Sequence, residues 1–194
     1  MLASLGCEPL ELGEVRRMIG DGVATLVARA LAARGRAQAD HAAATQTFMR
    51  QYEAGATSLT TVYPGVDTTL QALHAAAIPL AVCTNKPAGL ASRILEHLGL
   101  TRYFAQVLGG DSLPFRKPDP RVLLALVQAF DTTAQRSLLV GDSEVDAATA
   151  AGAGVPFVLM SGGYRRGAVA DIVPSIAALE SFAELPALLG VPLR

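Results

Sequence analysis

The first sixty residues carry apolar side chains at helical spacing and show no strand-like alternation. Over residues 12–31 the apolar positions recur every three or four residues, and Gly35 is expected to end that stretch. A second helical stretch is expected over about residues 37–53. The turn signal at 63–66 (Tyr-Pro-Gly-Val) ends the helical pattern. The sequence therefore predicts a small all-helical module over residues 1–62.

From residue 63 onward, short apolar runs alternate with amphipathic stretches of helix length. This alternation predicts right-handed crossovers and a parallel sheet with helices on both faces. The expected fold class is α/β, with the core at residues 63–194. Strands are expected over 78–83, 106–108, 137–140, 155–160 and 171–173, and helices over 88–98, 120–130, 144–151 and from about 175.

Composition and charge argue against nucleic acid and membranes as binding partners of this chain. The net charge of −1 shows no excess of basic residues that would attract nucleic acid, and no apolar run approaches the length of a membrane span. The apolar share of 51% supplies material for a folded core. Cys7 and Cys83 have no metal or redox spacing, which favours free thiols and a cytoplasmic location.

The candidate chemistry follows directly after the predicted strands. In an open parallel sheet, ligands bind beyond the carboxyl ends of the strands, so these side chains are expected to surround one pocket. Taken singly, each segment also has an ordinary interpretation as a turn, a helix cap or a solvated charge. The candidate residues are Thr84, Asn85 and Lys86 after the strand at 78–83, Lys117 in the string Arg-Lys-Pro-Asp-Pro at 116–120, and Asp142 and Asp146 after the strand at 137–140.

Together, these segments indicate a binding site more strongly than any one of them does alone. A hydroxyl, an amide, a lysine and an acidic cluster at one sheet edge are suited to bind a phosphoryl group, neutralise it and hold a divalent cation. Mg²⁺ prefers oxygen ligands and usually keeps several waters, so few carboxylates suffice. Phosphoryl transfer asks the protein mainly for positioning and charge neutralisation. The sequence therefore predicts a Mg²⁺-dependent phosphoryl-transfer site.

These three segments resemble the second, third and fourth motifs of the haloacid dehalogenase superfamily in order, placement and spacing. The resemblance covers residues 63–194 and implies a Rossmann-like parallel-sheet core; the helical module is similar to the cap that this superfamily inserts after its first motif. Within the superfamily, the strings at 83–87, 17–23 and 162–164 look most like bacterial phosphoglycolate phosphatases. The implied activity is Mg²⁺-dependent hydrolysis of 2-phosphoglycolate, a small phosphorylated metabolite, by a monomer or homodimer in carbohydrate metabolism.

The resemblance also implies roles at the phosphoryl group. Thr84 and the Asn85 region are expected to hydrogen-bond the transferring phosphoryl oxygens. Lys117 is expected to lie between the nucleophilic carboxylate and the phosphoryl group, where it offsets the repulsion of two anions. Lys86 is expected either to reach the substrate's carboxylate or phosphate or to remain solvated. Lys117 and Thr84 are therefore the expected catalytic residues.

Two further roles concern the metal and the cap. Asp142 is expected to ligate Mg²⁺ directly, and Asp146 to act behind it or through water. In the cap, the segment 20–22 (Gly-Asp-Gly) is expected to form a loop over the site or a turn between two helices. Arg16 and Arg17 are candidates to read the substrate's carboxylate.

The first motif of the superfamily, a strand that ends in Asp-x-Asp, does not occur in this sequence. Its first aspartate attacks phosphorus, and the second serves as general acid and base. Residues 1–6 look like the tail of the first cap helix. We therefore expect an N-terminally incomplete cap, a core that lacks its first strand, and no hydrolysis by the chain as given.

Two alternatives remain open from the sequence. The chain is also compatible with another capped phosphatase or a phosphoglucomutase of the same superfamily. A non-catalytic protein that retains affinity for phosphate is the alternative from a different functional class.

Overall fold

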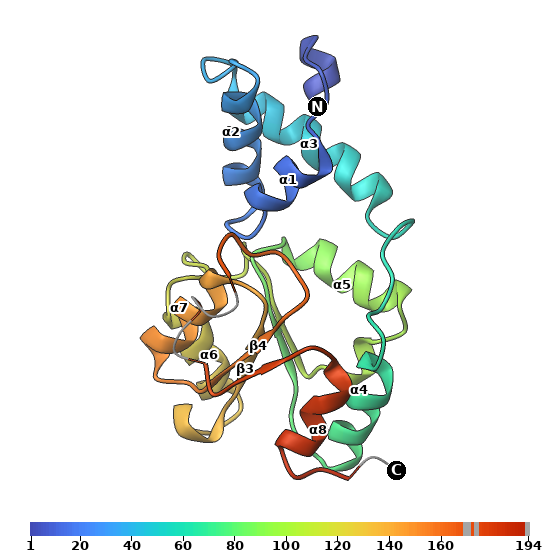
Figure 1. Ribbon diagram of the computed structural model, residues 1–194, viewed down its shortest axis with the longest axis vertical. Coiled ribbons are helices and arrows are strands. Elements are labelled where there is room, and N and C mark those ends of the chain that lie inside the picture. The colour runs from blue at the N-terminus through green and yellow to red at the C-terminus, as the bar shows by residue number, and fades with distance from the viewer. Residues whose placement is uncertain (169–171, 173–174, 193–194) are drawn as a thin grey trace.

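The computed structural model describes residues 1–168, 172 and 175–192. A helical module stands at one end of the elongated molecule and an α/β core at the other (Figure 1). The module contains η1 (Leu2–Leu5), α1 (Leu12–Met18), α2 (Val23–Ala33) and α3 (His41–Gly55). No described helix has both the length and the apolar character needed to cross a membrane.

The helix expected over residues 12–31 is broken in the structure. Gly20 and Gly22 adopt φ angles of 121° and 90°, which favour glycine, and the chain turns between α1 and α2. Apolar periodicity alone did not reveal this break, because the apolar positions continue through it. Residues 20–22 form the turn between α1 and α2, and Gly20 and Gly22 also line the cavity described below.

Helices of the module pack on one another through the apolar face of α2. Val27 and Leu31 are buried and contact Ala44 of α3, which is also buried. Asp40 begins α3 by accepting a hydrogen bond from the Ala43 backbone N–H at 3.0 Å, as a capping aspartate does. The module therefore has a small core of its own.

In the core, strands alternate with helices as the sequence predicts, and every strand pair is parallel. The α/β fold class is confirmed. The elements are α4 (Val66–Ala75), β1 (Ala81–Cys83), α5 (Ala88–His97), η2 (Thr101–Tyr103), β2 (Gln106–Leu108), α6 (Arg121–Ala129), η3 (Ala134–Arg136), β3 (Leu139–Gly141), α7 (Glu144–Ala153), β4 (Phe157–Met160), β5 (Ala177–Leu179), η5 (Phe182–Glu184) and α8 (Leu185–Leu188).

The strands form two separate parallel sheets among the described residues. One sheet contains β1 and β2, with Val82 opposite Val107. The other has the order β3-β4-β5, with Val140 opposite Val158. No strand pairing joins β1 to β3 in the described part of the chain. Among the described residues, the parallel sheet predicted from the sequence is therefore divided between these two strands.

Packing nevertheless joins the two sheets. Leu123 of α6, Ala150 of α7 and Phe157 of β4 belong to one buried cluster, against which Cys83 of β1 packs. All four residues of β4 are buried, as expected for a central strand covered on both faces. Burial of this apolar surface supplies the main stabilisation of the core.

Two predictions concern the C-terminal end of the core. The helix expected from about residue 175 is instead β5, which pairs with β4 and is followed by the short elements η5 and α8. The strand expected over 171–173 falls largely outside the described residues, since only Ile172 of the three is described.

Candidate functional site

Thr84 continues the pairing of β1 with β2 beyond the end of the strand. Its backbone N–H donates to the Leu108 carbonyl at 2.9 Å. Its hydroxyl oxygen Oγ1 accepts a hydrogen bond from the Lys86 backbone N–H at 3.1 Å. This local turn holds the Thr84 hydroxyl at the carboxyl end of β1, on the edge of the cavity described below.

Asn85 connects three segments that are distant in the sequence. Its side-chain amide nitrogen Nδ2 donates to the carbonyl of Gly20 at 3.0 Å and to the carbonyl of Lys117 at 2.8 Å. Its carbonyl oxygen Oδ1 is buried and accepts no hydrogen bond within the described residues. Asn85 therefore ties the turn between α1 and α2 to the core.

Lys117 forms a buried ion pair. Its ammonium Nζ donates to the Asp146 carboxylate oxygen Oδ1 at 2.6 Å and to the Cys83 carbonyl at 2.7 Å. The other oxygen of Asp146, Oδ2, accepts from the Ser143 hydroxyl at 2.7 Å and from the Asp142 backbone N–H at 3.1 Å. Burial acts to raise the pKa of Asp146, but the Lys117 charge and these hydrogen bonds outweigh it and lower that pKa.

Asp142 lies in a different environment. Its Oδ2 accepts a hydrogen bond from the Tyr164 backbone N–H at 2.8 Å, and no hydrogen bond from a described residue reaches its Oδ1. Burial raises the pKa of Asp142, and the Tyr164 N–H only partly opposes this. The close approach requires Gly163, since a Cβ atom at that position would collide with the Asp142 carboxylate.

Asp142 and Asp146 are the acidic side chains of the cavity that could bind a divalent cation. Within residues 1–168, 172 and 175–192, no group of three or more His, Cys, Asp or Glu side chains is arranged to hold a metal ion. Mg²⁺ needs few protein carboxylates because it keeps waters. One oxygen of Asp142, Oδ1, accepts no hydrogen bond from a described residue, and a bound cation would stabilise the buried Asp142 carboxylate in its charged form. Both oxygens of Asp146 already accept hydrogen bonds. The residues fit Mg²⁺ held by Asp142, with Asp146 behind it.

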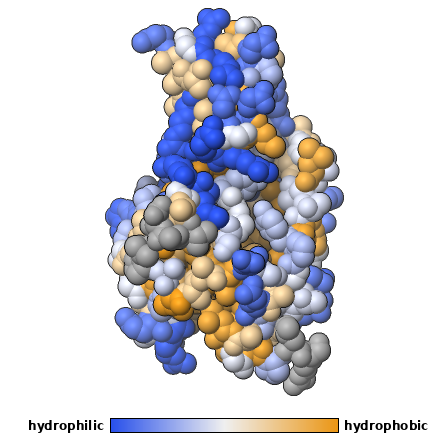
Figure 2. Space-filling view, viewed as in Figure 1, coloured by the Kyte–Doolittle hydropathy of each residue, from blue (hydrophilic) through white to orange (hydrophobic). Residues whose placement is uncertain are grey.

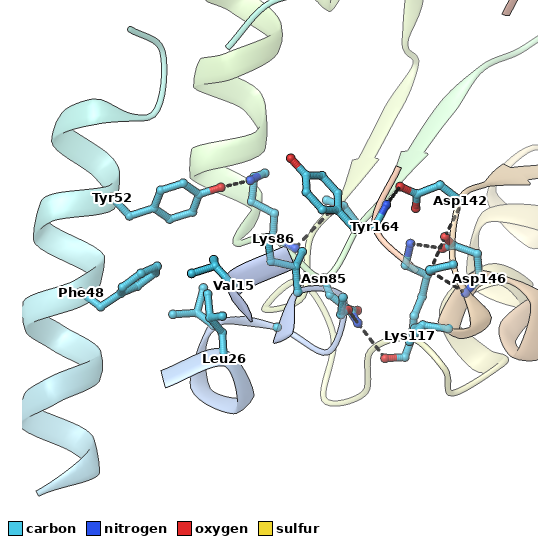
Figure 3. Close-up of a pocket in the computed structure, with 17 residues that line it drawn as sticks. Val15, Leu26, Phe48, Tyr52, Asn85, Lys86, Lys117, Asp142, Asp146 and Tyr164 are labelled. Atoms are coloured by element: carbon cyan, nitrogen blue, oxygen red, sulfur yellow. Dashed lines mark hydrogen bonds and ion pairs between the residues drawn. The ribbon is translucent and has the colours of Figure 1, made fainter. Parts of the chain in front are cut away.

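A cavity of about 480 Å³ lies between the helical module and the carboxyl ends of β1 and β3. Figure 3 shows its lining, with Lys117, Asp142 and Asp146 grouped on the core side. Figure 2 shows hydrophilic side chains gathered on the visible face where the module meets the core. The side of the cavity formed by the module is mostly apolar, with Val15, Ile19, Val23, Leu26 and Phe48.

Lys86 and Tyr52 meet across this cavity. The Lys86 ammonium donates a hydrogen bond to the Tyr52 hydroxyl (Figure 3). It also lies 4.7 Å from the centroid of the Tyr52 ring, within the range of a cation–π interaction. Since Tyr52 belongs to α3 and Lys86 follows β1, this contact joins the helical module to the core.

The structure brings the six residues predicted beyond the strand ends to one cavity. Their roles in binding, catalysis and metal coordination stay predictions. Arg16 and Arg17, proposed to read a carboxylate, are exposed and lie outside the lining, so the structure does not support that expectation. The six predicted residues found in the cavity lining are Thr84, Asn85, Lys86, Lys117, Asp142 and Asp146.

Sequence reasoning missed three contributors to the cavity. Ser143 orients Asp146 and begins α7, and the spacing Ser-x-x-Asp at 143–146 is a signal for such a cap. Tyr164 supplies the backbone N–H to Asp142, and its place after two glycines was the available signal. Tyr52 has no distinguishing signal, because its partner lies in another part of the chain.

Comparison with known proteins extends these observations. The family model described as haloacid dehalogenase-like hydrolase matches residues 1–160. The chain is 45% identical to a phosphoglycolate phosphatase from Cereibacter sphaeroides over 190 residues, which covers 97% of this chain and 86% of the relative. It is also 45% identical to a phosphoglycolate phosphatase from Rhodospirillum rubrum, with 98% and 81% covered.

Solved structures show the same fold. The crystal structure of a predicted phosphoglycolate phosphatase from Haemophilus somnus superposes with a TM-score of 0.90 at 30% identity, covering 97% of this chain and 86% of that one. A putative phosphoglycolate phosphatase from Lactobacillus delbrueckii superposes with a TM-score of 0.87 at 22% identity, covering 97% and 88%. The second likeness concerns the fold alone.

Proposed function

The chain belongs to the haloacid dehalogenase-like hydrolase family, and we propose that it is the larger part of an enzyme that hydrolyses 2-phosphoglycolate with Mg²⁺. The observation that carries the proposal is the convergence of Thr84, Lys117 and Asp142 on one cavity. Relatives at 45% identity that are named phosphoglycolate phosphatase support the choice of substrate.

Two residues are proposed to bind the phosphoryl group. The Thr84 hydroxyl, held at the end of β1, donates to a phosphoryl oxygen while its lone pair accepts the Lys86 N–H. The Lys117 ammonium neutralises charge that gathers as the nucleophile approaches. Asp146 holds this ammonium in place through its 2.6 Å ion pair. Positioning and neutralisation are what phosphoryl transfer chiefly requires from a protein.

Asp142 is proposed to hold Mg²⁺ through the oxygen that no described residue hydrogen-bonds. When bound there, the cation supplies positive charge that stabilises the phosphoryl oxygens during transfer. Asp146 keeps the Asp142 backbone in position by accepting its N–H at 3.1 Å. Gly163 allows the segment before Tyr164 to pass close to the Asp142 carboxylate.

The nucleophile is proposed to come from a segment that this sequence does not contain. The printed sequence has no Asp-x-Asp string, and hydrolysis through an aspartyl-phosphate needs a carboxylate placed in line with the phosphoryl group. The unpaired edges of β1 and β3 support a place for a further parallel strand between the two sheets. Without that segment, the chain as given is proposed to be inactive.

The test measures release of phosphate from 2-phosphoglycolate by two forms of the protein. One form is the 194-residue chain, and the other adds the codons found in frame upstream of it. We expect the extended form to release phosphate only when Mg²⁺ is present, and the shorter form to release none. A Lys117→Met variant of the extended form is the matched inactive control.

Three results would contradict the proposal. A clear preference for a sugar phosphate over 2-phosphoglycolate would favour another capped phosphatase or a phosphoglucomutase. Binding of inorganic phosphate without hydrolysis by either form would favour a non-catalytic protein. Absence of an Asp-x-Asp strand from the upstream reading frame would exclude the proposed source of the nucleophile.

A further inference from the structure

Among the described residues, Lys86 has no counter-ion inside the cavity. No described carboxylate pairs with its ammonium, whose partner is the neutral hydroxyl of Tyr52. Lys117, the other lysine in the lining, is by contrast paired with Asp146 at 2.6 Å. A partly buried positive charge that the protein leaves uncompensated is suited to receive an anionic group from a ligand.

Tyr52 is held in a fixed position. Its ring packs against Phe48, one helical turn earlier in α3, with centroids 5.6 Å apart. The next residue, Glu53, accepts a hydrogen bond on its carbonyl from the Arg93 side chain of α5 at 2.6 Å. This end of α3 is therefore tied to the core, and the Tyr52 hydroxyl presents a constant partner to Lys86.

The arrangement separates two positive centres within one cavity. Lys117 lies on the core side with Asp142 and Asp146, whereas Lys86 points toward α3 (Figure 3). A substrate with a phosphoryl group at the first centre and a second anionic group at the other would satisfy both. The remaining wall from the helical module is apolar and offers no competing cation among the described lining residues.

We propose that Tyr52 is a positioning residue that holds the Lys86 ammonium for the second anionic group of the substrate. The inference rests on the proposed function and adds to it residues that determine substrate specificity. It predicts selection of phosphomonoesters that carry a carboxylate near the phosphate. Because the pair spans α3 and the core, this selection depends on the helical module being seated on the core.

The test compares two substrates that differ only at this point. Ethyl phosphate has a methyl group where 2-phosphoglycolate has a carboxylate. The kcat/KM ratio between the two substrates is measured for the extended protein and for its Tyr52→Phe, Lys86→Met and double variants. We expect each single substitution to lower the ratio at least about tenfold, mainly through KM for 2-phosphoglycolate, a factor that corresponds to about 1.4 kcal/mol.

The double variant separates positioning from a structural role. If Tyr52 acts through Lys86, Tyr52→Phe has no further effect on the ratio once Lys86 is Met. Tyr63→Phe is the matched control, because this tyrosine is 61% exposed and lies outside the cavity lining. It is expected to leave the ratio unchanged.

Two outcomes would overturn the inference. A Tyr52→Phe variant that slows both substrates equally, or effects that add in the double variant, would assign Tyr52 a structural role only. If the unsubstituted extended protein hydrolysed neither substrate, the proposed function itself would fail and the inference with it. The unsubstituted protein therefore distinguishes the two failures.

Discussion

The ammonium of Lys117 and the carboxylate of Asp146 lie 2.6 Å apart, with side chains that are only 11% and 8% exposed. The two residues come from different elements, the loop before α6 and the first turn of α7. Further hydrogen bonds from Ser143 and the Asp142 backbone occupy the rest of the Asp146 carboxylate. The stability of the fold is therefore expected to depend on both partners of this pair, which also belongs to the candidate site.

Substitution of Lys117 by Met is expected to lower the free energy of unfolding by about 3–5 kcal/mol, because it leaves a buried carboxylate without a counter-ion. Urea unfolding of the 194-residue chain measures this loss. The matched control is Lys86→Met, a lysine of the same cavity that pairs with no described carboxylate. An equal loss from the control would show that the ion pair contributes no particular stability.

Gly163→Ala is expected to displace the Asp142 carboxylate. The added Cβ would collide with Asp142, and the φ angle of 133° at this position disfavours any residue other than glycine. We therefore expect Mg²⁺-dependent phosphate release by the extended protein to fall at least about a hundredfold, the scale seen when one charge-stabilising group of an active site is lost.

The neighbouring glycine provides the control for this substitution. A Cβ at Gly162 would meet nothing within 4 Å, and its φ angle is not positive. Gly162→Ala is expected to retain activity and thermal stability. If both variants behaved alike, the close approach of residue 163 to Asp142 would have no functional importance.

Glu14 gives the helical module a dependence on pH. The pKa of Glu14 lies below its ordinary value of 4.5, chiefly because the Arg34 side chain hydrogen-bonds its carboxylate, with a contribution from the Glu11 backbone N–H. Since the folded-state pKa is depressed, this contribution to stability is fully present above pH 4.5 and is lost as pH falls through the folded-state pKa.

The corresponding experiment compares the melting temperature of Glu14→Gln with that of the unsubstituted chain at several pH values. We expect the variant to melt lower near pH 7 and the difference to shrink as the pH falls below 4.5 and through the folded-state pKa. Glu96→Gln, at an exposed position with no side-chain bond to a described residue, is the control. A difference that stayed constant down to low pH would contradict the linkage.

Much of the core was predictable from local pattern. The strand at 106–108 was predicted with the observed limits, since an apolar run between turn residues defines it. The convergence of Thr84, Lys117 and Asp142 followed from parallel topology, which places strand ends at one edge. No knowledge of side-chain contacts was needed for either result.

Three features depended on tertiary context. Residues 177–179 (Ala-Ala-Leu) favour a helix locally, yet pairing with β4 makes them a strand. The break at Gly20 was masked by apolar positions on both sides of it. Tyr52 meets Lys86 across 34 residues of sequence, and periodicity carries no information on such a contact.

Asn85→Asp is expected to loosen the turn between α1 and α2 from the core. Nδ2 donates to the carbonyls of Gly20 and Lys117, and a carboxylate oxygen in its place would face both carbonyls with no proton to donate. The loss of unfolding free energy is expected to be about 1–3 kcal/mol for each unsatisfied group. Hydrogen exchange should quicken at residues 19–22 before it quickens in β4.

Gln135→Glu, the same chemical change at an exposed position without a side-chain bond to a described residue, should alter neither quantity. Unchanged exchange at residues 19–22 in Asn85→Asp would mean that other contacts hold this turn.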